Sequence, residues 1–374
     1  MPEDPSNRPT VIGLFNWSPP PGETPGLVNP RYPLPYRADW LPCVAPLDLR
    51  LISPAVGRLH RKSRDVLEHR TGRRLDLVAR AIAPARRADA VLAFLEDQIP
   101  ALSWMRRRGL PPYAALPAVG ISCWWAEELE AGSISGAEVA RHVAGLDRLL
   151  VFSGNQQEIF ARAGVDPAMI RPIRFGADHE YFTPGNEPER VDVLAVGIDR
   201  GRDWRTLIEA ARRIPDVQVH IVTGSDRVPA NRPSSVIVHP PTDFESYRDL
   251  LRTARVVAVP SYDLAYPTGQ SVLLEAMACG RCVVVTETEA MRDYIFHDHA
   301  NLAVPPSDPE ALADMLSAAL RDDSRRRRVG AEARSAVERL FTFERMWSQI
   351  GTEILDVIER HGSPVYVPPQ QGVN

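Results

Sequence analysis

Gly269, Gln270, Ser271 and Val272 lie where a turn runs into an apolar helix, in the stretch PTGQSVLLEAMACGRCVVVT of residues 267–286. The first backbone N–H groups of a helix have no partner within that helix, and the helix dipole places partial positive charge beside them. Such a terminus attracts phosphate. Gly269 lacks a Cβ atom, so a bulky anion can approach its backbone. We therefore predict that the N–H groups of residues 269–272 bind a diphosphate.

Arg200 and Arg202 flank Gly201 in VGIDRGRDWRTLIEAA, just after the first strand expected in the second half of the chain. A guanidinium group donates paired hydrogen bonds to phosphate because its N–H groups form a planar fork. We predict that both arginines converge on the diphosphate and act catalytically by neutralising it. Asp203 is more simply the cap of the helix that follows.

Glu275 lies one turn into the helix that starts near Gln270. A carboxylate there is a poor neighbour for phosphate but can accept hydrogen bonds from two vicinal hydroxyls, such as those of a ribose. The alternative is a glutamate on a solvated helix face. Leu273, Leu274 and Ala276 surround it with apolar groups, which weakens that alternative.

The elements that position these residues alternate regularly from residue 191 onward. Apolar runs such as VDVLAVGI, VQVHIVTG and VVAVPS alternate with amphipathic stretches such as DWRTLIEAARRI and DFESYRDLLRTA. This alternation predicts strand-helix-strand units on a parallel sheet. Asp308 is expected to cap a helix, and further helix is expected to about residue 360. The first half carries strands predicted at 10–16, 88–96, 114–122, 148–153 and 170–176.

The length of 374 residues suggests two domains, at about 100 to 200 residues each. The segment DHEYFTPGNEPER, residues 178–190, is rich in Pro, Gly and acidic residues and reads as a linker. We predict an α/β protein with two doubly wound Rossmann-like domains facing across a cleft, residues 1–180 and 181–342. A flexible tail is expected at 363–374. In open parallel sheets, ligands bind beyond the carboxyl ends of the strands, where residues 269–272 are expected.

The composition is that of a globular protein, with 44% hydrophobic residues, 25% charged residues and a formal net charge of -4. It gives no indication of nucleic-acid binding. The apolar runs fall far short of the ~18 residues that a membrane span requires. The N-terminus has no basic start and no apolar segment of a secretory signal, so we expect a cytoplasmic protein. Residues 57–74 carry alternating charges, which favours a solvated helix over a peripheral membrane anchor.

Four cysteines fit a reducing compartment better than a disulfide framework. Cys279 and Cys282 form a C-x-x-C pair that spans a helix end and the next strand. A zinc site would need a second ligand pair, and a redox dithiol would sit at a helix start. We favour core packing for both thiols over redox or metal chemistry.

These motifs resemble those of a known family, the retaining glycosyltransferases of the GT-B fold, specifically family 4 (glycosyl transferases group 1). Residues 267–286 look like its C-terminal signature, in which a Gly-containing turn precedes E-A-M-A-x-G and an apolar strand. GRDWRTLIEAA is similar to its phosphate-clamp loop, and NLAVPPSDPEAL to its next strand and helix. LLVFSGNQQEIFARAGVDPAMIRPIRFGADHEYFTP resembles the segment that closes its N-terminal domain. The resemblance covers residues 148–345.

The resemblance implies transfer of a sugar from a nucleotide-sugar to an acceptor hydroxyl, with retention of the anomeric configuration. It implies no metal, no other cofactor and no protein nucleophile, because the departing phosphate accepts the acceptor's proton. By position, Arg202 matches the family's basic residue, Glu275 its ribose-binding Glu, and Pro241 the contact to the base. The N-terminal domain would bind the acceptor, a small molecule or glycan, and a helix at 343–362 would return to that domain.

Three departures from the family pattern concern the sugar, the phosphate and the acceptor. Pro267 stands where the family has a Glu that holds the donor sugar, so Asp263 and Tyr266 become candidates for that role. Ile198 replaces the Arg that usually follows the strand Gly, and Arg200 is the candidate substitute.

The third departure lies in the first half of the chain. Residues 16–42 are too rich in Pro for the usual helix, although Gly22 and Gly26 remain candidates to line the cleft. A family His near the acceptor has no match. Cys123, Trp124 and Trp125 stand there instead, as acceptor-site lining or as wall packing.

Two other functions fit the same expected fold. A nucleotide-sugar hydrolase or 2-epimerase would need acid/base groups in the cleft, and the sequence offers no convincing set. A binding protein would hold a nucleotide-sugar without turning it over. Release of nucleoside diphosphate without an acceptor discriminates the first from a transferase, and donor affinity without any product identifies the second.

Overall fold

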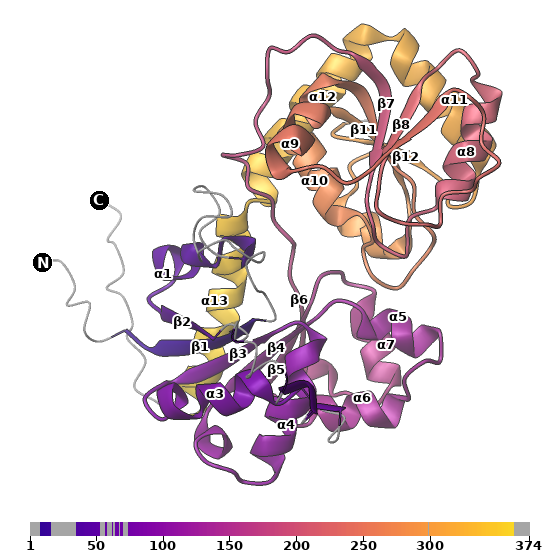
Figure 1. Ribbon diagram of the computed structural model, residues 1–374. Helices are drawn as coiled ribbons and strands as arrows, with labels where there is room; N and C mark the ends of the chain where they lie inside the picture. The colour runs from indigo at the N-terminus through magenta and orange to yellow at the C-terminus, as the bar shows by residue number, and fades with distance from the viewer. Residues whose placement is uncertain are drawn as a thin grey trace, which may run out of the picture. The chain divides into compact units, whose positions relative to one another are not determined.

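The computed structural model describes residues 8–15, 35–52, 74–297 and 299–362, together with residues 57, 62, 64–66 and 68–69. The chain divides into two compact units. The first unit comprises Met1–Phe152, Gln156–Ile173 and Met346–Asn374, and the second comprises Ser153–Asn155 and Arg174–Arg345. Each unit is built on a six-stranded parallel sheet flanked by helices, so the predicted α/β class with two doubly wound domains is confirmed (Figure 1).

The sheet of the first unit has the strand order β2-β1-β3-β4-β5-β6. Its strands are β1 (Thr10–Phe15), β2 (Asp48–Ile52), β3 (Ala90–Phe94), β4 (Ala118–Ser122), β5 (Arg148–Val151) and β6 (Ile170–Pro172). Its helices include α1 (Leu41–Val44), α3 (Asp76–Ala85), α4 (Ile99–Arg107), α5 (Trp125–Glu130), α6 (Gly136–Val143) and α7 (Gln156–Arg162). The five strands predicted for this half are present.

Two details of this sheet differ from the sequence prediction. β2 was not predicted, because no residue of DLRLI is fully buried and the segment follows a Pro-rich stretch. β4 begins at Ala118 rather than at residue 114, because Tyr113–Ala115 form a 3-10 helix. β2 depends on its position at the edge of the sheet, and the start of β4 depends on the local helical turn before it. The pattern of apolar residues alone shows neither.

The sheet of the second unit has the order β12-β11-β10-β7-β8-β9. Its strands are β7 (Val191–Val196), β8 (Val219–Val222), β9 (Val236–His239), β10 (Ala254–Val259), β11 (Cys282–Thr286) and β12 (Leu302–Val304). Its helices are α8 (Trp204–Arg213), α9 (Phe244–Thr253), α10 (Gln270–Ala278), α11 (Pro309–Arg321) and α12 (Asp323–Leu340). β10 and β11 are runs of buried apolar residues, as strands covered on both faces require.

Two helices of the second unit, α8 and α11, begin at aspartates that cap them. Asp203 Oδ1 accepts a hydrogen bond from the Thr206 N–H at 2.9 Å, and Asp308 Oδ1 accepts one from the Ala311 N–H at 2.9 Å. Each bond satisfies a backbone donor that the helix itself cannot pair. The two caps predicted from the sequence are therefore confirmed.

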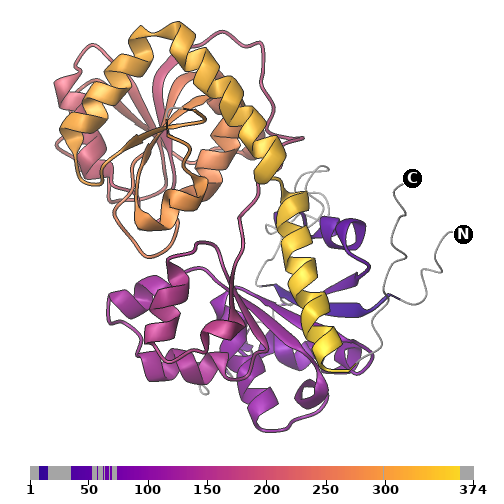
Figure 2. The same ribbon diagram turned by 180° about the vertical axis from the view of Figure 1, so that it is seen from behind.

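The long helix α13 (Phe343–Arg360) starts in the second unit and belongs to the first from Met346 onward. Figure 2 shows it, in yellow, lying along the first unit. The Trp347 ring stacks near Phe94 of β3, with ring centroids 6.1 Å apart. The guanidinium of Arg148 in β5 pairs with Glu353 at 2.9 Å and with Asp356. Arg148 is 1% exposed, so α13 supplies the counter-charges that this buried arginine needs.

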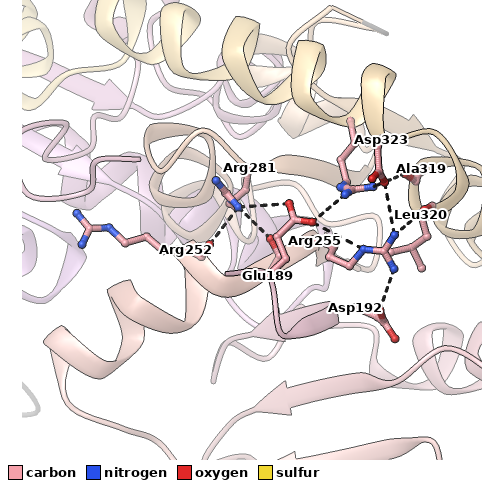
Figure 3. Close-up of polar contacts among 10 residues, drawn as sticks. Glu189, Asp192, Arg252, Arg255, Arg281, Ala319, Leu320 and Asp323 are labelled. Atoms are coloured by element: carbon pink, nitrogen blue, oxygen red, sulfur yellow. Dashed lines mark hydrogen bonds and ion pairs between the residues drawn. The ribbon is translucent and has the colours of Figure 1, made fainter. Parts of the chain in front are cut away.

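A cluster of charges joins the linker of the second unit to β10, to α12 and to the turn between α10 and β11 (Figure 3). Glu189 Oε2 lies 2.8 Å from Arg326 Nη2 and 3.9 Å from Arg255 Nε, and Glu189 Oε1 lies 3.8 Å from Arg281 Nη1. The Arg326 side chain is only 3% exposed. Glu189 therefore helps to neutralise the buried guanidinium of Arg326, and it links residues 178–190 to β10 and α12.

We expect Glu189→Gln to lower the free energy of unfolding of the second unit by about 1–2 kcal/mol, because the buried guanidinium of Arg326 loses one of its two counter-charges and keeps only Asp323. Hydrogen exchange of β10 and α12 peptides measures this local stability. Glu187→Gln is the matched control. Its carboxylate pairs with Arg252 at 3.5 Å, is 38% exposed, and is expected to change stability by less than about 0.5 kcal/mol. Equal effects of the two substitutions would contradict the role of Glu189.

Candidate functional site

The loops that follow β7 and β10 meet, because these two strands are neighbours in the sheet. Arg202 and Ser261 form an isolated antiparallel bridge between them. The Tyr262 N–H donates to the Gly201 carbonyl at 2.9 Å, and the Asp203 N–H donates to the Pro260 carbonyl at 3.1 Å. These bonds fix the first loop against the residues that directly follow β10, at the carboxyl ends of the strands where ligands of open α/β sheets bind.

Arg202 is buried at this junction, with 4% of its surface exposed. Its guanidinium lies against two glycines. A Cβ added at Gly197 would come 2.3 Å from Arg202 Nε, and one added at Gly269 would come 2.3 Å from Arg202 Nη1. Both positions therefore require glycine, and Gly269 also has a left-handed φ of 89°.

The Nε and Nη1 atoms of Arg202 have no hydrogen-bond partner in the described part of the chain. Burial lowers the pKa of this guanidinium, and the negative charge of Asp199 opposes that shift. Buried donors without acceptors cost free energy. An anion bound against Arg202 and the start of α10 would remove that cost, so the arrangement is one that could bind an anion.

At the start of α10, some but not all of the backbone N–H groups predicted to bind a diphosphate are available to a ligand. The Gln270 N–H donates to the Pro267 carbonyl at 3.2 Å, so the prediction of a free donor there is wrong: the tight turn before the helix uses it. Within the described residues, the N–H groups of Gly269, Ser271 and Val272 have no acceptor. Gly269 is the N-cap and brings no side-chain cap, which leaves this end open to an external anion.

Asp199 is a site residue that the sequence analysis missed. Its Oδ1 accepts hydrogen bonds from the Gly201 N–H at 2.7 Å, the Tyr266 hydroxyl at 2.6 Å and the Thr268 hydroxyl at 2.7 Å. Burial acts to raise the pKa of Asp199, but the bonds from Tyr266, Thr268 and Gly201 outweigh it and lower the pKa. The signal available in the sequence was an aspartate two residues before a glycine, which is typical of an Asx-turn.

The two candidates for the donor sugar have different surroundings. The Tyr266 side chain is buried, 3% exposed, and its hydroxyl proton is already committed to Asp199. Asp263 lies exposed on the same loop. Arg200 is also exposed and is hydrogen-bonded to Tyr266, so it lies at the rim of the site while Arg202 lies at its base.

Glu275 is part of the same cluster. Its Oε2 accepts a hydrogen bond from the Tyr247 hydroxyl at 2.6 Å, and Tyr247 is a second residue that the sequence analysis missed. Burial raises the pKa of Glu275 to about 7, against the opposing effects of the Tyr247 hydrogen bond and the charge of Arg202. This environment is not that of a glutamate on a solvated helix face.

An apolar surface lies beside the cluster, at the carboxyl ends of β7, β8 and β9. A Cβ added at Gly224 would lie 3.1 Å from Pro241 Cγ and 3.9 Å from Ile198 Cγ2, so the three residues are neighbours. Ile198 is 71% exposed. The structure thus places Pro241, predicted to contact a base, against a second exposed apolar residue.

The first unit contains the residues predicted to bind an acceptor. Cys123 is buried, 9% exposed, and Trp124 is 37% exposed. Trp124 and Trp125 line a groove of about 730 Å³ that also contacts α4 and α6. The charged residues of the groove are Arg74, Arg107, Arg108, Arg141, Glu96, Asp97, Glu128 and Glu138. Gly22 and Gly26 lie outside the described residues.

Glu96 organises the wall of this groove. Its Oε1 accepts hydrogen bonds from the Ser122 hydroxyl at 2.7 Å and the Trp125 N–H at 3.2 Å, as well as from the N–H groups of Cys123 and Trp124. Burial raises the pKa of Glu96. The carboxylate therefore holds the start of α5, and with it the exposed Trp124 ring, after β4.

The thiols of the C-x-x-C pair are buried, Cys279 at 0% and Cys282 at 1% exposed, and neither forms a disulfide. Burial raises the pKa of each to about 12, as expected for packed thiols. Across the residues that the structure describes, no group of three or more His, Cys, Asp or Glu side chains could hold a metal ion. In that same part of the chain, no helix is long and apolar enough to cross a membrane.

Residues 191–322 match the family described as Glycosyl transferases group 1. D-inositol 3-phosphate glycosyltransferase from Xylanimonas cellulosilytica is 30% identical over 259 residues, which cover 60% of this chain and 59% of that protein. For the first three curated relatives, the chain spans between 51% and 59% of their length.

Solved structures share the fold over nearly the whole chain. Sucrose-phosphate synthase from Thermosynechococcus elongatus has a TM-score of 0.70 and 18% identity, and the match covers 94% of this chain and 100% of that one. Anabaena HepE in complex with UDP-glucose has a TM-score of 0.66 and 16% identity, with coverage of 94% and 100%. At these identities the likeness establishes the fold.

The raised pKa of Glu275 predicts a pH-dependent stability. The ordinary value of 4.5 rises to about 7, so between these pH values the folded protein holds a proton that the unfolded chain has lost. Stability therefore falls as the pH rises through this window. Glu275→Gln cannot ionise and is expected to exceed the parent in free energy of unfolding by about 1–3 kcal/mol at pH 8. Urea unfolding at pH 5 and pH 8 measures it, and the same pH dependence in both proteins would contradict the assignment.

Proposed function

We propose that the protein transfers a sugar from a nucleoside-diphosphate sugar to an acceptor hydroxyl, because residues 191–322 match the family described as Glycosyl transferases group 1 and the chain has the GT-B fold. The observation that carries this proposal is the buried guanidinium of Arg202, whose Nε and Nη1 atoms have no acceptor in the part of the chain that the structure describes. These donors lie against Gly269, the N-cap of α10. The site is built for an anion that the ligand-free protein does not supply.

The diphosphate of the donor is that anion in the proposed function. Negative charge develops on it as the sugar departs, and fixed donors in a buried site stabilise such charge strongly. Arg202, Arg200 and the N–H groups of Ser271 and Val272 would neutralise the leaving group. The proposal assigns this task to protein groups and not to a metal ion.

The nucleoside fits the remaining parts of the site. Glu275 would accept hydrogen bonds from the two ribose hydroxyls, since its carboxylate lies at the second turn of α10. The apolar surface of Ile198 and Pro241 would contact a nucleobase. Anabaena HepE is described in complex with UDP, which makes UDP a suitable first probe.

Retention of the anomeric configuration is part of the proposal. Asp199 and Glu275 are poor nucleophiles in their observed surroundings, because Asp199 Oδ1 accepts three hydrogen bonds and Glu275 Oε2 is bonded to Tyr247. A reaction on one face of the sugar needs no protein nucleophile. The departing phosphate would take the proton of the acceptor hydroxyl as the new glycosidic bond forms.

The groove of the first unit supports a hydroxyl-rich acceptor. Four arginines and four carboxylates line it, and Arg74 already pairs with Asp97. Hydroxyl groups can donate to carboxylates and accept from guanidinium groups, so they match such a lining better than a single charge does. The exposed face of Trp124 would stack on a sugar ring or another flat acceptor.

The direct test of the proposed function is a product search. The protein is incubated with UDP-, GDP- and ADP-sugars and a panel of sugar, sugar-phosphate and phenolic acceptors, and products are identified by mass spectrometry. A glycosylated acceptor with retained configuration supports the proposal. Rapid release of nucleoside diphosphate without an acceptor would identify a hydrolase instead, and donor binding with no product from any pair would identify a binding protein.

Arg202→Met is expected to weaken UDP binding by about 10- to 100-fold, because charge-assisted hydrogen bonds to phosphate are lost from a buried site. Isothermal titration calorimetry measures the affinity. Arg205→Met is the matched control, since Arg205 lies exposed on the next turn of the same segment. An unchanged affinity in the Arg202 variant would refute its phosphate role.

Trp124→Ala is expected to lower kcat/KM for the acceptor by about tenfold through the loss of one stacking surface. The UDP affinity serves as the internal control and should not change, because Trp124 belongs to the first unit. Steady-state kinetics with the acceptor found in the product search provide the measurement. Unchanged kinetics would show that the Trp124 ring is only wall packing.

A further inference from the structure

We infer that Tyr247 is a positioning residue that fixes one oxygen of Glu275 and keeps this carboxylate ionised for the nucleoside. The inference deepens the proposed function and rests on it for the identity of the ligand. The contact joins α9 to α10, with the Tyr247 hydroxyl 2.6 Å from Glu275 Oε2. Of the described residues, Tyr247 alone bonds the Glu275 carboxylate.

The direction of this hydrogen bond is fixed. Burial, followed by the neighbouring charge of Glu275, raises the pKa of Tyr247 well above its ordinary value. The phenol therefore stays protonated at physiological pH and donates, while the carboxylate accepts. Glu275 Oε1 and the second lone pair of Oε2 remain for a ligand. Two vicinal hydroxyls require these acceptors.

The Tyr247 ring is held in place by its aromatic neighbours. Phe182 packs edge-on against it with ring centroids 5.9 Å apart, and Phe244 does so at 6.2 Å. Asp243 caps α9 through the Ser246 N–H at 2.9 Å. A phenol held by packing and by a capped helix loses little freedom when it bonds Glu275, so it can orient the carboxylate before a ligand arrives.

The burial of Glu275 explains why such a donor is needed. A carboxylate in this position tends to take up a proton, and a protonated group accepts ribose hydroxyls poorly. Three titratable or charged groups face Glu275: Tyr247 from α9, Arg202 from the loop before α8, and Cys279 at the end of α10. Cys279 is a neutral buried thiol at this pH, because burial raises its pKa to about 12. Tyr247 and Arg202 are therefore the groups that favour the ionised form.

The decisive variant is Tyr247→Phe, which removes the hydroxyl and keeps the ring. UDP affinity is measured by calorimetry between pH 5.5 and 8.5. We expect about tenfold weaker binding at pH 7, and the pH at which binding is half lost should move upward by about one unit. Tyr294→Phe is the matched control, because it removes a phenol of the same unit whose hydroxyl accepts a hydrogen bond from the Phe175 N–H at 3.0 Å, and the pH midpoint should stay in place.

A merely structural role gives a different result. Loss of packing would weaken binding by the same factor at every pH and leave the midpoint unchanged, and that result would overturn the inference. In the double variant Tyr247→Phe with Glu275→Gln, the second substitution removes the titrating group. The upward shift must therefore disappear, and its persistence would equally overturn the inference.

A ligand-free measurement separates this inference from the proposed function. The carboxyl resonances of ¹³C-labelled glutamate are followed against pH, and the Glu275 signal is identified by its absence in Glu275→Gln. The midpoint of this signal should rise in Tyr247→Phe. If the parent binds no UDP, the proposed nucleotide site fails, yet this titration still decides whether Tyr247 controls the ionisation of Glu275. An unmoved midpoint would refute that control.

Discussion

A buried guanidinium with two nitrogens that find no acceptor among the described residues is the constraint around which the second unit is arranged. Arg202 places its guanidinium between the backbones of Gly197 and Gly269, and neither position has room for a side chain. The ionised Asp199 lies nearby and compensates part of the positive charge of Arg202. Its Oδ1, however, already accepts hydrogen bonds from Gly201, Tyr266 and Thr268. An external anion would compensate the positive charge that remains at Arg202. Without such an anion the buried guanidinium lowers the stability of the fold, but it is already in position to bind one.

The sheet order makes this arrangement possible. β7 and β10 are adjacent although they are far apart in the sequence, so their following loops can bond to one another before α8 and α10 begin. Glu275 and Tyr247 come into contact because α9 leads into β10 and α10 leads out of it. The proposed phosphate site, the carboxylate and the phenol that holds it therefore belong to the loops and helices that flank two adjacent strands.

Much of this could be predicted from the sequence, because it depends on local chemistry. Apolar runs separated by amphipathic stretches predicted the strands of the second sheet, and a Gly before an apolar helix predicted the open N-terminus of α10. The partnership of Asp199 with Tyr266 and that of Tyr247 with Glu275 were not predictable, because each joins residues 28 or more positions apart. The hydrogen bond of the Gln270 N–H depends on the exact turn geometry, which a residue pattern does not specify. β2 was missed because an edge strand with partly exposed residues has little apolar signal.

The placement of α13 sets an order for biosynthesis. The second unit is complete at Arg345, whereas the first unit requires Met346 and the residues after it. Until that helix emerges from the ribosome, Arg148 lacks Glu353 and Asp356, and the aromatic rings of β1 and β3 lack Trp347. The half of the chain that is translated first is therefore the half that finishes folding last. Its unfinished apolar face must wait, during synthesis of the whole second unit, for a chaperone or for its own C-terminal helix.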